Sequence, residues 1–276
     1  MRSFLSKGWP PRYLMCPQIR LKTPLKERPG NGRALRARVR RISGVLEEVL
    51  GVPVQSGKPP PSMDMLIATV LSQNTNDRNS HRAYVALRQR HPTWHSVAEA
   101  PVRSLAATIR SGGMANQKAA RIKGILRTIY SVYGRYDLSA LQKRSNEEII
   151  DELTRMKGVG TKTAACVLVF ALGRDVFPVD THVYRLCERL GLTLNSRSPD
   201  DTFEQMKPLI PAGKGYSFHT NLIRFGRKVC HARRPACGLC PLYDDCVYDG
   251  KERGTARSLK TSKADHSFML LDEISP

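Results

Sequence analysis

The sequence predicts an all-α fold, on two observations. Between residues 42 and 250, apolar residues recur at the three- and four-residue spacing of an amphipathic helix; Ile122, Ile125, Leu126 and Ile129 are one example. No stretch shows the regular alternation of apolar and polar residues that is typical of a half-buried strand. We therefore expect helices and no sheet.

The predicted helices follow one another along the chain, and turn or cap residues delimit them. The apolar residues that mark them lie at 65–70 after Pro61 and Ser62, 83–87 before His91 and Pro92, 105–109 before Gly112 and Gly113, 122–129, 166–172, 203–210 after Ser198 and Pro199, and 222–225 before Cys230. A further helix opens at Ser145 and ends over residues 153–157. Ser145 and Glu148 have the spacing of a capping box, in which side chains and backbone amides of the first turn satisfy one another.

The composition favours an anionic polymer as partner. The 276 residues include 45 Lys and Arg against 24 Asp and Glu, a formal net charge of +21. Nucleic acid is the first candidate for such an excess, and a membrane surface the second. No apolar run approaches the roughly eighteen residues that a membrane span needs, so we expect no membrane insertion. Seven cysteines, an odd number without a visible secretory signal, favour a reducing intracellular location, the cytoplasm or nucleoid or an organelle or nucleus.

The two ends of the chain differ from its middle. Residues 1–41 contain twelve Lys or Arg and a single acid, Glu27, with several prolines. We expect 1–34 to be a flexible basic arm that adds non-specific affinity for phosphate. Residues 251–276 have the composition of a polar tail.

Four cysteines, Cys230, Cys237, Cys240 and Cys246, have the spacing C-x6-C-x2-C-x5-C. Four thiolates on one short segment form a soft, closed ligand set, for which zinc and an iron–sulfur cluster are the candidates. Zinc sites more often contain two C-x2-4-C pairs, whereas this segment has only one. A cubane tolerates uneven spacing because each thiolate binds a different iron. The spacing therefore favours a [4Fe–4S] cluster over zinc, and either over disulfides.

A glycine-rich turn, Gly158-Val159-Gly160, lies between two predicted helices. Glycines let a backbone come close to a ligand, and the amides that open the second helix point outward with a partial positive charge. A plain helix–turn–helix corner would also place a glycine here. The doubled glycine and the Lys-Thr-Ala that follows favour a helix–hairpin–helix motif that cradles phosphate.

Lys162 and Asp180 are the candidate reactive residues. A lysine at the positive end of a helix is electrostatically unfavourable, so it indicates either phosphate contact or a nucleophilic amine with a depressed pKa. Asp180 follows the rigid segment Phe177-Pro178-Val179 and could equally be the N-cap of the next helix. We interpret the nearby His182 as a polar residue of that helix's first turn.

These motifs, taken in chain order, resemble the endonuclease III family of helix–hairpin–helix DNA glycosylases, which act in base-excision repair. The resemblance covers roughly residues 35–250. Besides the cysteine spacing it rests on L-x4-G-V-G-x-K-T-A from Leu153, P-V-D-T-H-V-x-R from Pro178, L-S-Q-N-T-N-D from Leu71, G-M-A-N-Q-K-A from Gly113, and H-x6-G-R-x2-C from His219.

The resemblance implies two helical domains. Residues 56–174 would form a six-helix barrel that contains the helix–hairpin–helix motif. An N-terminal helix within 35–55 and residues 175–250 would form an iron–sulfur domain, where a structural [4Fe–4S] cluster shapes a basic loop near Arg233 and Arg234 that grips phosphates.

The resemblance also implies a reaction on duplex DNA that carries damaged bases, oxidised pyrimidines above all, or abasic sites. The damaged base is flipped out of the duplex into a cleft between the domains. The Lys162 amine attacks C1′ of the sugar, displaces the base and forms a Schiff base, after which β-elimination cuts the strand. Asp180 activates the amine and stabilises the positive charge that builds on the sugar. The enzyme would act as a monomer.

The DNA contacts are implied in the same way. Gln73 would fill the gap left by the flipped nucleotide, and Met114 would wedge the opposite strand. The hairpin would contact DNA through Gly158, Val159, Gly160 and Thr161.

Two other functions stay open at this point. A monofunctional glycosylase would act on another mismatched or damaged base; adenine-mismatch relatives place a glutamate near Ala68 and lack the lysine found at Lys162. A non-catalytic DNA-binding protein would need only the charge and the hairpin. The presence of both Lys162 and Asp180 favours lyase activity.

Overall fold

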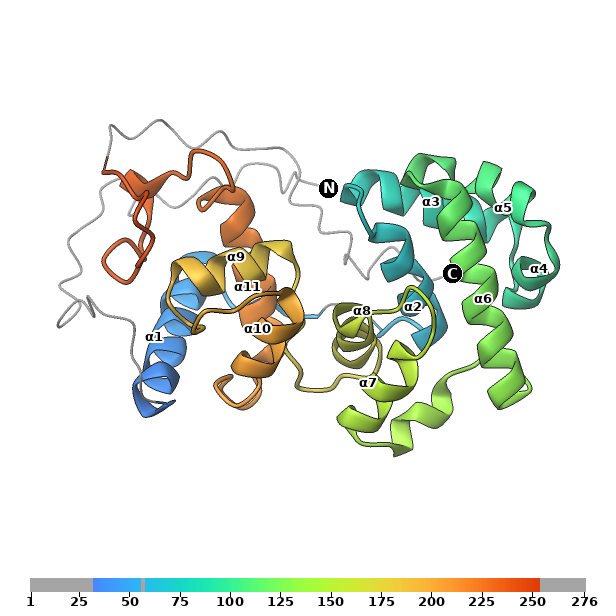
Figure 1. The fold of residues 1–276 in the computed structure, drawn as a ribbon, viewed down its shortest axis with the longest axis horizontal. Helices are drawn as coiled ribbons and strands as arrows, with labels where there is room; N and C mark the ends of the chain where they lie inside the picture. Colours follow the sequence, from blue (N-terminus) through green and yellow to red (C-terminus); the bar gives the residue numbers. More distant parts are fainter. Residues whose placement is uncertain (1–31, 56–57, 254–276) are drawn as a thin grey trace, which may run out of the picture. The chain divides into compact units, whose positions relative to one another are not determined.

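The computed structural model describes residues 32–55 and 58–253, and their regular structure is entirely helical (Figure 1). The predicted all-α class is confirmed. The predicted arm 1–34 and tail 251–276 lie outside the described residues, apart from 32–34, which open the first helix, and 251–253. No helix in the described part of the chain is long and apolar enough to cross a bilayer.

The described residues form two compact units. One comprises those up to Pro53 and from Val179 on, and the other runs from Val54 to Pro178. The division of 56–174 as a six-helix barrel from 35–55 and 175–250 stays a prediction.

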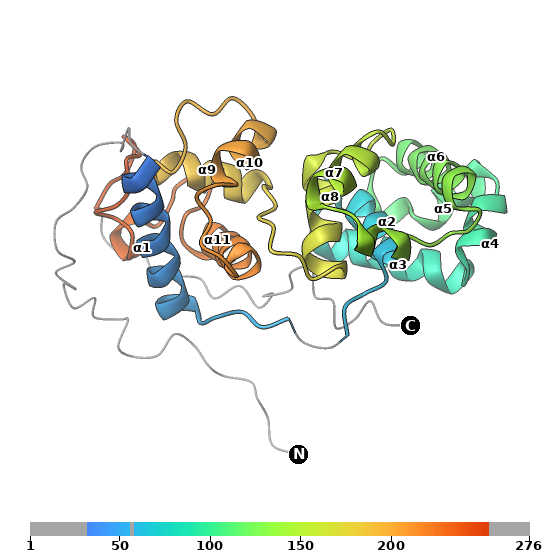
Figure 2. The same ribbon diagram turned by 90° about the horizontal axis from the view of Figure 1, so that it is seen from below.

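The unit that carries the cysteines, the cysteine unit, has long helices around a small core. Its elements are α1 (Gly32–Leu50), α9 (Thr181–Arg189), α10 (Pro199–Met206), α11 (Gly215–Lys228) and the 3-10 turn η5 (Cys237–Leu239). Helix α1 buries Val39, Ile42 and Leu46 at helical spacing. This helix packs against α11, which also contacts α9 (Figures 1 and 2).

A buried arginine fixes α1 to the segment that carries the cysteines. The Arg38 side chain is fully buried and donates to the carbonyl oxygens of Leu190, at 2.8 Å, and Asp245. One turn on, Arg41 forms an ion pair with the Asp245 carboxylate. Burial lowers the pKa of Arg38, and a buried guanidinium needs such partners because an unpaired one would be costly. The N-terminal helix is therefore an integral part of this unit.

The other unit, the hairpin unit, contains more helices among its described residues. Its elements are α2 (Ser62–Ser72), α3 (Asp77–Arg90), α4 (Trp94–Glu99), α5 (Val102–Thr108), η2 (Arg110–Gly112), α6 (Ala115–Tyr133), η3 (Ser139–Lys143), α7 (Asn146–Thr154), α8 (Thr161–Cys166) and η4 (Val167–Ala171). Helix α2 is central: it is buried from Met63 to Leu71 and contacts α3, α6 and α8 (Figure 2). A helix that is apolar on all sides belongs in a core.

Local cap chemistry agrees with the structure in part. The predicted capping box opens α7: the Ser145 hydroxyl accepts from the Glu148 amide, and the Glu148 carboxylate accepts from the Ser145 amide. The helix predicted after Pro61 and Ser62 begins at that point, since Pro61 is the N-cap residue and Ser62 the first helical residue, but no side chain makes a cap hydrogen bond there. The short helix α4 was not predicted; it has its own capping box on Thr93.

The helix predicted over 166–172 is present, but it is α-helical only at Cys166. After Cys166 the chain widens into a π-helical turn, Val167–Ala171, and the Leu172 amide donates to the Val167 carbonyl five residues back. The Gln55 side chain donates to the Phe170 carbonyl at 2.8 Å. The π-helical turn thus keeps Val167–Phe170 buried. The Gln55 side chain provides a hydrogen bond to a carbonyl that this turn displaces from the α-helical pattern.

Candidate active site

The glycine-rich turn forms a hairpin between α7 and α8. Gly158 has φ +91°, which favours glycine, and Gly160 is the extended N-cap residue of α8. The amides of Thr163 and Ala164 return to the Gly160 carbonyl at 2.9 and 3.1 Å. Lys162 is half-buried at the second position of α8. The hairpin therefore presents a lysine directly beside an exposed glycine backbone.

Gln73, the residue after α2, lies against this hairpin. Its Nε2 donates to the Gly158 carbonyl at 3.0 Å and is 3.5 Å from the Thr163 hydroxyl. Its Oε1 accepts from Arg121 Nη1 at 3.0 Å. The structure thus brings together two predicted DNA-contact elements that are 85 residues apart in sequence.

A second predicted DNA contact, Met114, lies beside the Gln73 segment. Met114 is 49% exposed, and its Sδ is 3.7 Å from Nδ2 of Asn74. Asn74 and Met114 have φ of 52° and 50°, a left-handed conformation that costs free energy in residues other than glycine. Strained, exposed residues in contact at the tips of two loops are typical of a binding surface.

Lys118 joins the bases of these two loops. Its side chain is 1% exposed, and Nζ donates to the carbonyl oxygens of Leu71 and Gly112, at 2.7 Å each. Burial, together with nearby Arg121, lowers the pKa of Lys118 to about 8. An ammonium group buried at such a position is there to hold both loops, since its desolvation is unfavourable.

Asp180 belongs to the cysteine unit, at the start of α9. Its Oδ1 accepts from the Val183 amide at 2.8 Å, so Asp180 is the N-cap of α9, and the structural alternative considered above is correct. The cap uses one carboxylate oxygen. A capping role therefore does not exclude a reactive one.

Arg185, one turn along α9, connects this helix to the cysteine segment. Its Nη2 donates to the carbonyl of Cys230 at 2.9 Å and that of Gly226 at 3.3 Å. The same nitrogen is 3.2 Å from Nδ1 of His182, which is half-buried in the first turn of the helix. Burial lowers the pKa of Arg185, and the neighbouring Cys230 and, to a smaller extent, Asp180 oppose this effect. His182 thus contacts α9 itself, as its interpretation as a first-turn polar residue predicts.

The four cysteines line one pocket together with apolar residues of the same unit. Arg189 Nη1 donates to Cys230 Sγ at 3.3 Å, and Cys246 Sγ is 3.2 Å from the Arg189 carbonyl. The Arg189 guanidinium also stacks over the ring of Tyr248, 4.2 Å from its centre. N–H donors to thiolates and a hydrophobic surround are the features that support an iron–sulfur cluster.

Burial raises the pKa of the Cys240 and Cys246 thiols, and the other cysteines of the set add to the effect. Four thiolates on one segment would repel one another without a cation, and iron binding would hold them deprotonated. In the described residues, no three His, Cys, Asp or Glu side chains are placed to bind a single metal ion. The donor set and its N–H partners fit a cluster that all four cysteines share.

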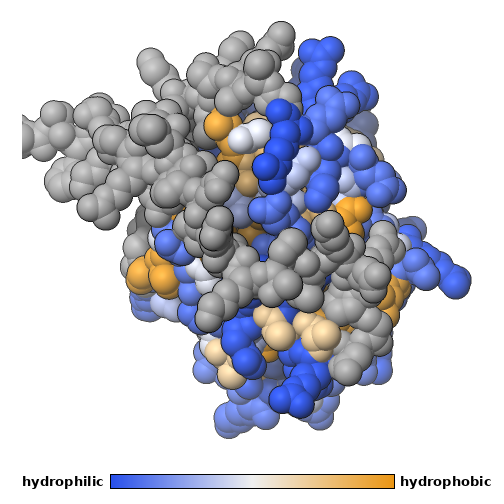
Figure 3. All heavy atoms as spheres, turned by 90° about the vertical axis from the view of Figure 1, so that its left-hand side faces the viewer, coloured by the Kyte–Doolittle hydropathy of each residue, from blue (hydrophilic) through white to orange (hydrophobic). Residues whose placement is uncertain are grey.

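The predicted phosphate-gripping residues lie in the same segment. Arg233 and Arg234 are exposed, and Arg234 has φ 53°. Figure 3 shows the side on which α1 and the cysteine segment lie in Figure 1; its described residues are mainly hydrophilic, with only small hydrophobic areas. Such a surface suits a charged partner.

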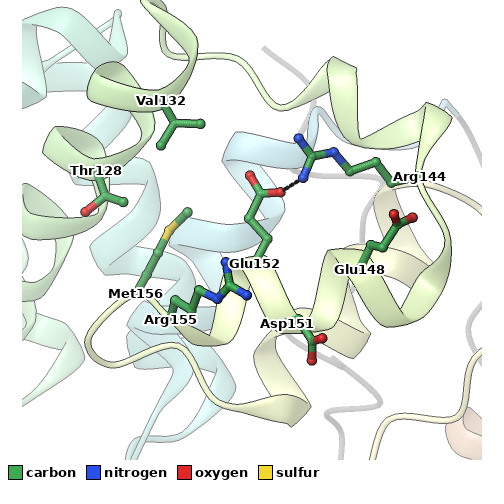
Figure 4. A pocket seen from close by; sticks show the side chains of 8 residues that line it. All are labelled: Thr128, Val132, Arg144, Glu148, Asp151, Glu152, Arg155 and Met156. Atoms are coloured by element: carbon green, nitrogen blue, oxygen red, sulfur yellow. Dashed lines mark hydrogen bonds and ion pairs between the residues drawn. The ribbon is translucent and has the colours of Figure 1, made fainter.

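A separate pocket of about 410 Å³ lies between α6 and α7, and its lining residues precede the hairpin in sequence (Figure 4). Charged residues of both signs line it, and two of them, Arg144 and Glu152, form an ion pair. None of the predicted catalytic, DNA-contact or cluster residues lines this pocket. The candidate site is therefore formed by the hairpin and the loops beside it.

Sequence reasoning gave no role to several residues that organise the site. Arg185 belongs to the P-V-D-T-H-V-x-R motif, so a signal existed without an assigned function. Lys118 likewise lies in the G-M-A-N-Q-K-A segment that begins at Gly113, with no role assigned to it. Arg121 and Arg189 lie in no quoted motif, and their contacts join residues 48 and 41 positions apart.

Comparison with known proteins matches both parts of the chain. Residues 67–212 match the family described as HhH-GPD superfamily base excision DNA repair protein. Residues 230–246 match the iron-sulfur binding domain of endonuclease III.

Individual relatives give the extent of the similarity. Endonuclease III of Thermotoga maritima is 34% identical over 195 residues, which cover 70% of this chain and 87% of that protein. A relative from Arabidopsis thaliana is 38% identical over 168 residues, 61% of this chain, and the match spans 57% of the relative's length. The solved structure of a non-covalent endonuclease III–DNA complex aligns with a TM-score of 0.67 at 28% identity, over 76% of this chain and 94% of that one.

Proposed function

The chain belongs to the HhH-GPD superfamily of base excision DNA repair proteins, and we propose that it is a bifunctional glycosylase and abasic-site lyase whose nucleophile is Lys162. The resemblance to the endonuclease III family is confirmed. The protein is an endonuclease III-like DNA glycosylase, a DNA-binding enzyme with a [4Fe–4S] cluster.

The observation that carries the lyase proposal is the position of Lys162 directly after the hairpin turn, at the second residue of α8. Its Nζ would attack C1′ of the damaged nucleotide, and the C1′–N bond to the base would break. The sugar ring would open to a Schiff base on Lys162. Loss of a C2′ proton would then break the bond from C3′ to the 3′ phosphate, and water would release the amine.

Asp180 would assist this reaction from the N-cap of α9. One carboxylate oxygen holds the Val183 amide, which fixes the carboxylate, and the other would face the sugar as positive charge develops. Gln73 would enter the space left by the flipped base, and Met114 would wedge the opposite strand. Oxidised pyrimidines in duplex DNA are the substrates we infer.

The remaining residues would hold the DNA backbone. The opening amides of α8, around Gly160 and Thr161, have no acceptor within their own helix and would bind a phosphate, with Gly158 and Val159 shaping the approach. Arg233 and Arg234 would bind phosphates beside the cluster. The cluster itself would be structural: Cys230, Cys237, Cys240 and Cys246 would hold it, and it would shape the loop that carries these arginines.

Borohydride trapping on a duplex with one abasic site tests the proposal. Wild type should give a covalent protein–DNA adduct, and Lys162→Gln should give none. Lys157→Gln, which removes an exposed lysine five residues away, is the matched control and should trap normally. If wild type binds the duplex tightly but gives no adduct, the lyase proposal is wrong and a monofunctional glycosylase replaces it.

A further inference from the structure

Arg121 links the hairpin to the Gln73 segment within the hairpin unit. It lies on α6, one turn after Lys118, and is half-buried. Its Nη1 is 3.0 Å from Gln73 Oε1, while Gln73 Nε2 is 3.0 Å from the Gly158 carbonyl. The amide of Gln73 therefore bridges a guanidinium and a hairpin carbonyl.

These two partners determine the orientation of the Gln73 amide, that is, whether its oxygen or its nitrogen faces Arg121. A guanidinium can only donate hydrogen bonds, and a carbonyl can only accept them. If the Gln73 amide were turned over, its NH2 group would face the donors of Arg121 and its oxygen would face the Gly158 carbonyl.

The stem of Arg121 contacts the hairpin as well. A Cβ at Gly158 would lie 2.7 Å from Arg121 Cδ and 3.1 Å from Nε. The stem therefore occupies the space that a side chain at the first hairpin glycine would need. Arg121 thus contacts both the hairpin turn and Gln73, the residue that lies against this turn.

We propose that Arg121 is a positioning residue for damaged DNA, which holds Gln73 in register with the hairpin so that both meet the same duplex. The inference rests on the proposed function, because Gln73 has the gap-filling role there. Lys118 fixes the backbone of the same loop from below, through Leu71, but does not contact the Gln73 amide. The orientation of that amide depends on Arg121 and Gly158.

The test measures equilibrium binding of the full-length protein to a duplex with a tetrahydrofuran abasic-site analogue, and to the same duplex undamaged. Arg121→Met keeps much of the stem and removes the donors. It should weaken binding to the abasic duplex about tenfold, the order expected for one charge-assisted hydrogen bond. Arg127→Met, on the exposed side of the same helix, is the control for the lost charge. Both variants should weaken binding to the undamaged duplex by the same factor.

A double-mutant cycle separates positioning from direct DNA contact. In a Gln73→Ala background, Arg121→Met should change abasic-site binding less than twofold beyond Arg127→Met. If its effect persists there, or if it equals that of Arg127→Met in the wild-type background, the inference is wrong. Arg121→Lys, with a single donor group, should recover part of the loss, and it serves if Arg121→Met does not fold.

The two proposals fail differently. If Gln73→Ala leaves the preference for the abasic duplex unchanged, the gap-filling role of Gln73 is wrong, and the inference about Arg121 is overturned with it. Lys162 trapping reports on the lyase step independently of either residue.

Discussion

Lys118 shows how a single buried charge can organise a binding surface. Its ammonium group is 2.7 Å from two carbonyl oxygens, one from each loop, in a site with almost no access to water. The charge therefore stabilises the loop arrangement through two hydrogen bonds while its own desolvation opposes folding. The pKa of Lys118, lowered to about 8, records that balance.

Because of this pKa, the unfolding free energy of the protein should change with pH in the alkaline range. The unfolded lysine titrates near 10.5 and the folded one near 8, so the unfolded state binds more protons between these values. The unfolding free energy of wild type should therefore rise as pH increases from about 8 to 10.5, by up to about 3 kcal/mol at about 1.36 kcal/mol per pKa unit.

Denaturant unfolding of wild type and Lys118→Arg across this range measures the effect. The arginine variant keeps a cation that does not titrate there, so it serves as the reference for all other groups. A difference between the two proteins that stays constant with pH would contradict the assignment.

Gly158 is the second residue on which the site depends. It has φ +91°, and Arg121 occupies the space where a Cβ would lie. Gly158→Ala should lower the unfolding free energy by about 1–3 kcal/mol and displace Arg121, so that abasic-site binding weakens as well. Gly124→Ala is the matched control, because Gly124 lies within α6 and a Cβ added there would meet nothing within 4 Å.

The control should be neutral or stabilising by about 0.5–1 kcal/mol, since alanine is the better helix former. Thermal unfolding and duplex binding of both variants decide the matter. Equal stability of Gly158→Ala and wild type would show that the turn accepts a side chain.

At the scale of elements, the N-cap of α9 combines a structural role and a proposed catalytic role in Asp180. Asparagine caps helices as well as aspartate does but carries no charge. Asp180→Asn should therefore keep the unfolding free energy within about 0.5 kcal/mol of wild type while base excision slows about a hundredfold or more. Single-turnover excision and thermal unfolding are the two measurements.

Asp180→Ala separates the roles further. It should lose the same activity and, in addition, about 1 kcal/mol of stability with the missing cap. If Asp180→Asn keeps full activity, Asp180 only caps α9, and the charge on the sugar is stabilised elsewhere.

Three helix N-caps could be predicted from the sequence. Ser145, Asp180 and Ser198 each cap a helix, and their side chains accept from amides three residues on. These contacts are local, so residue order is enough to find them. The π-helical turn after Cys166 was missed, because it depends on burial of the whole segment and on Gln55, 115 residues from its partner.

The same distinction, between local motifs and contacts of residues far apart in sequence, applies to the candidate site. The hairpin, Lys162, Asp180 and the cysteine spacing are sequence motifs, so residue order alone is enough to identify them. The network that joins Arg121, Gln73 and Gly158 could not be predicted in this way, because it forms only when α6, the end of α2 and the hairpin pack together. Helix α1 was expected from the resemblance alone, since its apolar positions are interspersed with arginines.

At the scale of the whole molecule, the cluster segment and the N-terminal helix depend on each other although they are far apart in sequence. Arg38 donates to the Asp245 carbonyl across 207 residues, and Arg41 pairs with the Asp245 carboxylate, one residue before Cys246. Arg189 contacts Cys230 and holds the carbonyls of the next two residues. Order in this unit therefore depends on how firmly the cysteines are held.

Removal of the cluster tests this dependence. Loss of the cluster should bleach the absorbance near 400 nm. Hydrogen exchange, measured by mass spectrometry, should then become faster in residues 230–253 and in α1. The hairpin unit, with its own core around α2, should keep its exchange protection, because local stability follows local packing. Cys237→Ser, prepared without the cluster, should give the same pattern.

The contrast between the units is what the experiment measures. Faster exchange throughout α2, α6 and α8 on cluster loss would mean that the two units unfold together, against the independence inferred from their separate cores. Unchanged exchange in α1 would mean that Arg38 and Arg41 hold the cysteine segment without help from the cluster. The expected result lies between these, with loss of protection limited to the unit that binds iron, since Arg38 and Arg189 connect α1 and the cysteine segment to other parts of that unit.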